Sequence, residues 1–319
     1  MPETPNTYGP YGILEISSNT VHFSVTFPDN NIQSTIDEKV KCGLGNYEAG
    51  SKALNATGKE KAIEMIAAYK RNFIDPIEFT EFAAIATGAL REATDAQEFL
   101  SYLKDELDID VQVLSGEEEA YYAALGVASS FKNANGVMFD QGGRSSEFVI
   151  IQNGQLTDAV SLPLGTFAIA EQKDPEKYIK QQLDKLPDAY RSGEFETLYA
   201  VGGSPRRLLK SHKKRTDTTG KLHGYTIPVS EAATLSKDVI DASEDTLKDE
   251  FYISEKRLTL VPAAAQLVSQ LSENLNIQKI TASKHGLRHG LLNEMINQPQ
   301  PDADEHSFEP NLHPRVVNG

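Results

Sequence analysis

Two short stretches of this chain place an acid at the end of an apolar run and follow it with small polar residues. They are Gly12–Thr20, GILEISSNT, and Gly136–Ser145, GVMFDQGGRS. Only the second stretch has glycines in its turn, which let the backbone approach a ligand closely, and successive N–H groups of such a turn can bind an oxyanion. That stretch therefore predicts either a phosphate-binding turn beside a carboxylate or a plain glycine turn with exposed charges, whereas the first alone indicates a strand, an acid and a turn.

The two stretches align without gaps at an offset of 125 residues. Glu15 falls on Asp140, and Thr20 falls on Ser145. Two unrelated turns could both contain small polar residues, because such residues favour turns everywhere. An acid at the same offset in both, each near the start of a similar strand–helix series, instead favours an internal duplication. We expect two similar α/β domains with a cleft between them.

The second stretch has the richer set of polar groups. Arg144 and Ser145 add a charged donor and a hydroxyl to the glycine turn. Glu147 lies two residues beyond Ser145, on the same face of the strand. A carboxylate beside a phosphate cradle is a common arrangement for holding Mg²⁺.

A third acidic stretch, SGEEEAYYAALGV, opens a predicted helix at Ser115–Ala128. Ser115 and Glu118 form a capping box, which accounts for Glu118 structurally. Glu119 lies one turn before Ala123 on the buried face and could border a cleft. There it could accept a proton from water.

Three further segments could contact an anion. Arg91 follows a strand predicted at 82–86, where it could reach an anion or make only a surface ion pair. Gly203 and Ser204 precede a helix whose N-terminus could hold phosphate. Arg206–Lys221 has seven Lys or Arg against one Asp, as in a solvated loop or an anion-guiding patch.

The composition limits the class of protein. The chain has 319 residues, a length that suggests two domains. Its net charge of −15 argues against broad nucleic-acid or membrane-surface binding. No apolar run could span a bilayer, and the polar N-terminus has no signal-peptide pattern. A single cysteine, Cys42, fits a reducing compartment, so we expect a cytoplasmic protein.

Together the motifs resemble the exopolyphosphatase / guanosine pentaphosphate phosphohydrolase (Ppx/GppA) family, in its short two-domain form. They come in the family's order over roughly residues 11–296 and read GILEISSNT, ATGALREATDAQEFL, VQVLSGEEEAYYAALGV, GVMFDQGGRSSEFVII, SLPLGTFAIAEQ, LYAVGGSPRRL, VPAAAQLV and ASKHGLRHGLL. The resemblance implies an α/β protein with two ribonuclease-H-like domains of the actin and sugar-kinase superfamily. The domains would cover 11–127 and 128–297, followed by a disordered tail at 298–319.

The resemblance also implies the chemistry. A homodimer would remove the terminal phosphate of polyphosphate, of pppGpp, or of both, with Mg²⁺ as cofactor. Glu119 matches the family's general base and Arg91 a phosphate contact. The phosphate-binding set would be Ser18, Asn19, Thr20, Gly142, Gly143, Arg144, Ser145, Gly203 and Ser204. The metal would be held by Asp140 with Glu147 or Glu15.

Three residues depart from the family's pattern. Glu15 replaces an Asp, Ser17 replaces a Gly, and Arg144 replaces another Gly. If Ser17 needed a positive φ, it would carry strain of roughly 1 kcal/mol. These changes leave three hypotheses: an exopolyphosphatase, a pppGpp 5′-phosphohydrolase, or a non-catalytic protein that binds polyphosphate or an alarmone.

Overall fold

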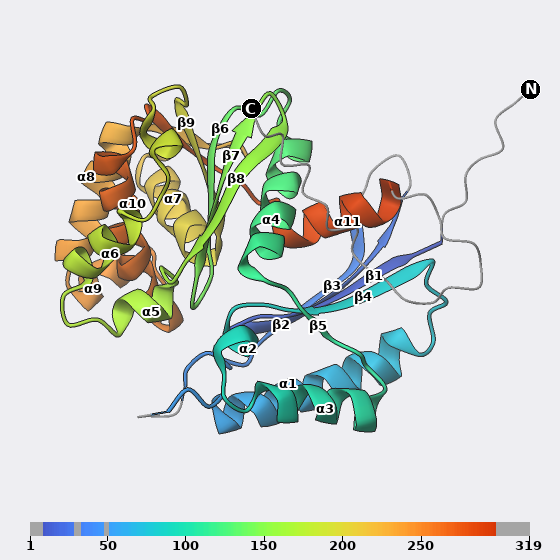
Figure 1. Cartoon of the computed structure of the whole chain (residues 1–319). Coiled ribbons are helices and arrows are strands. Elements are labelled where there is room, and N and C mark those ends of the chain that lie inside the picture. Colours follow the sequence, from blue (N-terminus) through green and yellow to red (C-terminus); the bar gives the residue numbers. More distant parts are fainter. Residues whose placement is uncertain (1–8, 29–32, 48–50, 298–319) are drawn as a thin grey trace, which may run out of the picture. The chain divides into compact units, whose positions relative to one another are not determined.

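The computed structural model describes residues 9–28, 33–47 and 51–297. Contacts divide these residues into two compact units, of which unit 1 comprises 9–115 and 292–297 and unit 2 comprises 116–291. Each unit has one β-sheet with helices packed against it (Figure 1). The predicted tail at 298–319 lies outside the described residues.

The sheet of unit 1 has the strand order β3-β2-β1-β4-β5. Its strands are β1 (Tyr11–Ile16), β2 (Thr20–Phe27), β3 (Gln33–Lys41), β4 (Glu81–Ala86) and β5 (Gln112–Val113). Its helices are α1 (Ala56–Tyr69) with a π-helical extension (Lys70–Ile74), α2 (Ala89–Glu92) and α3 (Ala96–Leu107). The first three strands are antiparallel, whereas β4 runs parallel to β1 and β5 parallel to β4. Phe23 stacks on Tyr69 and Phe73 in the core of this unit.

The sheet of unit 2 has the order β10-β11-β9-β6-β7-β8. Its strands are β6 (Gly136–Gln141), β7 (Ser146–Gln152), β8 (Gln155–Leu162), β9 (Thr197–Gly202), β10 (Thr226–Pro228) and β11 (Lys279–Ala282). Its helices are α4 (Gly116–Ser130), α5 (Thr166–Ala170), α6 (Pro175–Leu183), α7 (Gly203–Arg215), α8 (Val229–Asp241), α9 (Glu244–Asp249) and α10 (Leu260–Asn274). Short 3₁₀ turns stand at Asp188–Arg191 and Glu255–Arg257. The last helix, α11 (Leu287–Asn297), begins in unit 2 and ends in unit 1.

The two sheets share one arrangement. Three antiparallel strands come first in each unit, and two parallel strands add on the other side of the first: β4 and β5 in unit 1, β9 and β11 in unit 2. Unit 2 has one further strand, β10, which pairs antiparallel with β11. The first strands, β1 and β6, are separated by the offset of 125 residues seen in the sequence. The structure therefore agrees with an internal duplication.

Local sequence explains most element ends. Asn153 and Gly154 both have positive φ, 51° and 79°, as the type I′ turn favoured by an Asn-Gly pair between β7 and β8 requires. Asp174 caps α6 by accepting from the Lys177 amide, with Pro175 in the first helical position.

The helix predicted after Ser204 is confirmed. It continues to Arg215, so the alternative of a solvated loop is wrong for residues 206–215, where Leu208 and Leu209 are buried in the core. Helices of membrane-spanning length and apolarity are absent from the described residues.

Two acids lie close together in unit 1. Burial, with the nearby carboxylate of Glu294 on α11, raises the pKa of Glu81 on β4 to about 7. The native state therefore favours protonated Glu81, so its contribution to stability is full below the ordinary pKa of Glu. That contribution is lost as the pH rises toward about 7.

We expect Glu81→Gln to remove this loss. At pH 8 the variant should be more stable than wild type by on the order of 1 kcal/mol, since solvent screens a partly exposed carboxylate. Near the ordinary pKa of Glu the two proteins should unfold at similar urea concentrations. Glu78→Gln, at an exposed position, is the matched control. An equal shift at both pH values would contradict the assignment.

Candidate functional site

The turn that follows β6 is held by backbone hydrogen bonds to the start of α5. The carbonyls of Gly142, Gly143 and Arg144 accept from the amides of Thr166, Phe167 and Gly165, at 3.0, 2.8 and 3.1 Å. Within the turn, the Gly142 amide donates to the Ser145 carbonyl at 3.0 Å.

These bonds fix the direction of the turn's amides. In a trans peptide the N–H points opposite to the carbonyl of the same peptide unit. Because the carbonyls of residues 142–144 face α5, the amides of Gly143, Arg144 and Ser145 point away from it. Successive amides on one side of a turn form a concavity that attracts oxyanions. The geometry of this turn therefore suits a phosphate.

Gly165 is the tightest point of this contact. A Cβ there would lie 2.3 Å from backbone atoms of Gly143 and Arg144. Gly142 has more room, since its nearest neighbour would be the Ser145 carbonyl oxygen at 3.3 Å. The close approach of the two segments thus depends on the glycine at 165, a residue that sequence reasoning missed.

The two predicted metal-binding carboxylates of unit 2, Asp140 and Glu147, lie on one face of its sheet. Asp140 on β6 pairs in register with Glu147 on β7, which pairs with Ser161 on β8. Directly opposed residues point to the same face. Glu147 is fully buried, and its Oε1 accepts from the Ser161 hydroxyl at 3.0 Å.

Helix α4 covers this same face. Its Ala120, Ala123 and Val127 pack in a cluster with residues of β6, β7 and β9. The helix begins against Ser161, because a Cβ on Gly116 would lie 2.5 Å from the Ser161 Cβ. Half-buried Glu119 is in the first turn of α4, as predicted. Ser161 therefore contacts both the start of α4 and Glu147.

The glycine turn after β9 closes another side of Asp140. Gly202 has φ of 95°, and a Cβ there would lie 3.1 Å from Asp140 Oδ1 and 2.4 Å from the Gln141 carbonyl oxygen. A Cβ on Gly286, which precedes α11, would likewise lie 3.4 Å from Asp140 Oδ2. Of the two predicted phosphate ligands at the start of α7, Gly203 is exposed and Ser204 is buried.

Sequence reasoning also missed Arg257. Its guanidinium lies 3.3 Å from the position of a Cβ on Gly203. Burial, followed by the positive charges of Arg207 and Arg206, lowers its pKa. Three arginines thus gather at the start of α7. Only tertiary contact brings Arg257 there, so no local motif could have found it.

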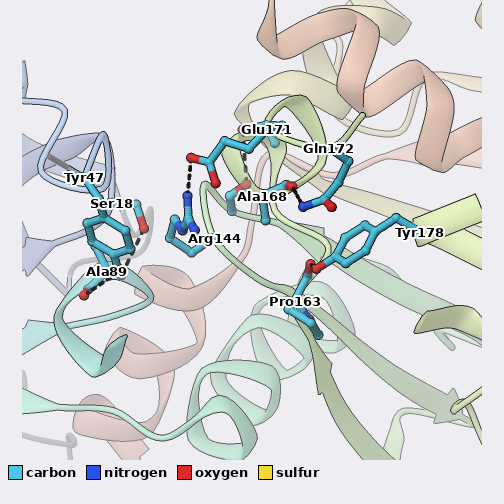
Figure 2. A network of polar contacts seen from close by, with 11 residues as sticks. Ser18, Tyr47, Ala89, Arg144, Pro163, Ala168, Glu171, Gln172 and Tyr178 are labelled. Carbon is cyan, nitrogen blue, oxygen red and sulfur yellow. Dashed lines mark hydrogen bonds and ion pairs between the residues drawn. The ribbon is translucent and has the colours of Figure 1, made fainter. Parts of the chain in front are cut away.

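Arg144 is directed toward α5 rather than left in solvent. Its Nη1 donates to Glu171 Oε1 at 2.7 Å, at the C-terminal end of α5 (Figure 2). The side chain is 11% exposed. The predicted extra charge at the turn is therefore balanced, at least in part, by Glu171.

The turn after β1 repeats this backbone pattern in unit 1. The Ser17 amide donates to the Thr20 carbonyl at 2.8 Å. The Ser18 carbonyl accepts from Gly45, and the Asn19 carbonyl accepts from Cys42 and Gly43. By the same reasoning the amides of Asn19 and Thr20 point away from residues 42–45.

The strain considered for Ser17 is absent. Ser17 is not among the described residues with positive φ. Its hydroxyl instead accepts from the Thr20 amide at 3.2 Å and bonds the Thr20 hydroxyl at 3.0 Å. The replacement of Gly by Ser therefore costs no backbone strain but engages an amide of the turn.

The remaining predicted residues of unit 1 adjoin this turn. The buried hydroxyl of Ser18 accepts from the Ala89 amide at 3.1 Å, in the α2 turn that carries Arg91 (Figure 2). Arg91 Nη1 donates to the Leu114 carbonyl at 3.0 Å. Glu15 pairs in register with His22, where unit 2 has Glu147.

The carboxylates of unit 2 suit a hard divalent cation. Asp140 and Glu147 are acids at neighbouring positions on adjacent strands. Mg²⁺ is commonly held by one or two carboxylates with water and substrate phosphates completing the shell. A larger cluster of three or more His, Cys, Asp or Glu is not found within the described ranges.

Comparison with known proteins decides the family. The model of the Ppx/GppA phosphatase family matches residues 25–298. The chain belongs to this family. It is 25% identical over 314 residues to a guanosine-5′-triphosphate,3′-diphosphate pyrophosphatase of Aeromonas hydrophila, covering 94% of this chain and 62% of the relative. It is 26% identical to retrograde regulation protein 2 of Saccharomyces cerevisiae, covering 89% and 55%.

Solved structures of the Ppx/GppA family share the fold. The Aquifex aeolicus member matches with a TM-score of 0.75 and 21% identity, over 91% of this chain and 99% of that one. An exopolyphosphatase from Cytophaga hutchinsonii matches with a TM-score of 0.79 and 19% identity, over 90% and 97%. The predicted fold class, two ribonuclease-H-like α/β domains, is confirmed. The chain spans about 60% of the length of the curated relatives it matches.

A column of histidine rings lies beside this site in unit 2. His285 stacks on His223 and His289, with centroids 4.6 and 4.1 Å apart, and Phe131 extends the column. Burial lowers the pKa of His223 and of His285, and the charge of Lys284 lowers both further. His285 adjoins Gly286, which contacts Asp140. The packing therefore favours the neutral forms of His223 and His285.

The column predicts acid sensitivity. A lowered pKa in the native state means that stability is full above the ordinary pKa of His and is lost as the pH falls below it through the lowered native pKa. His285→Phe keeps the stacked ring and removes one proton site. Because the pKa of His285 is lowered in the native state, we expect the variant to lose less stability than wild type between pH 8 and pH 5.5. Urea unfolding at both pH values measures this, and equal losses would contradict it.

Gly165→Ala tests the contact between the turn and α5. A methyl group 2.3 Å from backbone atoms must force the segments apart, so we expect a loss of about 1–3 kcal/mol in unfolding free energy. Gly142→Ala should cost clearly less, because its added carbon would meet one oxygen at 3.3 Å. Equal losses in urea unfolding would show that the contact is not tight.

Proposed function

We propose that the protein is an exopolyphosphatase, which hydrolyses the terminal phosphate of inorganic polyphosphate with Mg²⁺. The observation that carries this proposal is the arrangement in unit 2. The outward amides of residues 143–145 adjoin Asp140 and Glu147, on the sheet face that α4 covers. Family membership and the exopolyphosphatase among the similar structures support it.

The proposed reaction uses these groups in order. The amides of Gly143, Arg144 and Ser145 hold the terminal phosphoryl oxygens. Glu119 takes a proton from water as the new P–O bond forms. The P–O bond to the next phosphate breaks, its electron pair stays on the oxygen of the shortened polyphosphate chain, and the products are orthophosphate and that chain. Because the transition state is loose, positioning and charge stabilisation supply most of the rate.

Asp140 and Glu147 are the residues of unit 2 that would hold the metal. Bound Mg²⁺ would neutralise charge on the phosphate oxygens. Glu15 remains a predicted third ligand, and Arg91, Ser18, Asn19 and Thr20 remain predicted phosphate contacts on the family resemblance.

A second candidate activity is hydrolysis of pppGpp. The relatives named guanosine-5′-triphosphate,3′-diphosphate pyrophosphatase favour it. Side-by-side kcat/KM values on polyphosphate and pppGpp distinguish the two activities. Tight binding with no turnover under any divalent metal would instead identify a non-catalytic binding protein.

Glu119→Gln tests the proposed base. The amide cannot accept the proton of water, so we expect phosphate release from polyphosphate to fall by about 10²–10⁴-fold in the presence of Mg²⁺. The neighbouring exposed acid provides a matched control, since Glu117→Gln should retain the wild-type rate. Equal rates in wild type and Glu119→Gln would rule out this role for Glu119.

A further inference from the structure

The exposed face of α7 carries a stripe of positive charge. Arg206, Lys210 and Lys213 stand at i, i+4 and i+7, with Arg207 and Lys214 beside them, and we call these five residues the cationic stripe. The helix has no acidic residue. At 1.5 Å per residue, the stripe extends about 12 Å along the helix.

Most of this charge has no acidic partner. On the side facing α8, His212 lies 3.4 Å from Glu231 and Arg215 lies 3.7 Å from Asp238. Four stripe residues make no ion pair with any described carboxylate, namely Arg207, Lys210, Lys213 and Lys214. In a protein with a net charge of −15, such a stripe attracts anions locally.

Aromatic rings hold the far end of the stripe in place. Lys214 Nζ lies 3.4 Å from the centroid of Tyr252, and Lys213 Nζ lies 5.7 Å from that of Tyr225. Lys213 also donates to the Thr218 carbonyl. Positioned cations lose less conformational entropy when an anion binds. Since Lys214 covers the ring of Tyr252, that ring is a poor stacking platform for a nucleobase.

The near end of the stripe lies at the candidate site. Arg206 Nε donates to the Gly202 carbonyl at 2.7 Å, in the turn that packs against Asp140. Arg257 lies against Gly203 at the start of the same helix. Positive charge therefore continues from the turn beside Asp140 along α7, all within unit 2.

We propose that the cationic stripe is a binding subsite for the body of an inorganic polyphosphate chain whose end lies at the 142–145 turn. This inference rests on the proposed function and assigns its substrate as a linear polyanion. A stripe of about 12 Å adds contacts that only a long chain can use. The stripe should therefore raise affinity for long chains and leave short ones unaffected.

The test measures binding and turnover separately. In the triple variant Lys210→Gln/Lys213→Gln/Lys214→Gln, affinity for long-chain polyphosphate should fall about tenfold or more. The salt dependence, as the slope of log K against log salt, should weaken by about 2. Turnover of tripolyphosphate should stay within about twofold of wild type. The control removes three exposed lysines in or beside α6, as Lys177→Gln/Lys180→Gln/Lys185→Gln.

Each outcome bears on one hypothesis. Unchanged affinity in the triple variant, or an equal loss in the control, would overturn the stripe as a subsite. So would stripe-dependent binding of single-stranded DNA as tight as that of polyphosphate. Stripe-dependent polyphosphate binding without phosphate release would support the subsite while refuting the proposed hydrolysis. Circular dichroism and thermal unfolding of both triple variants confirm that they fold.

Discussion

The candidate site of unit 2 depends on the hydrogen bonds between the 142–145 turn and the start of α5. Three consecutive carbonyls accept from residues 165–167, and planar trans peptides then turn the intervening amides the other way. The partner segment is itself fixed, because Ser146 Oγ and Gln141 Nε2 both donate to the Leu164 carbonyl, at 2.8 and 3.1 Å. The anion-binding character of the turn thus comes from backbone geometry, and side chains around it supply the support.

Strand register places the carboxylates with respect to this turn. Asp140, Glu147 and Ser161 occupy one row across three strands, so all three face α4. A slip of one residue would send the row to the opposite face, among the apolar side chains of the larger core. Full burial of Glu147 is costly for a charged group unless it is hydrogen-bonded or near a cation. Its bond from Ser161 provides part of that compensation.

Local pattern predicted the elements that carry the site but not their contacts. The apolar runs of β1 and β6, the Asn153–Gly154 turn and the acidic start of α4 are all visible in the sequence. The helix after Ser204 was predicted, but its many cations obscured how far it extends toward Arg215. Two strands were not predicted from the sequence. Strand β3 is mostly polar, so it has little apolar pattern, and β10 has only three residues, too few to show a pattern. The contacts of Gly165 and Arg257 come from tertiary packing, which the periodicity of apolar residues along the sequence cannot predict.

The duplication conserves the backbone of the turn more closely than its chemistry. The amides of Ser17 and Gly142 each donate to the carbonyl of the residue three positions later, and neither residue has a positive φ. The Ser17 hydroxyl takes up the Thr20 amide, however, whereas Gly142 has no side chain that could engage the Ser145 amide. Likewise His22 stands where the second sheet has Glu147. With one amide engaged and imidazole in place of one carboxylate, the first turn offers fewer groups to an anion or a metal than the second. The proposed function therefore rests mainly on the groups of unit 2.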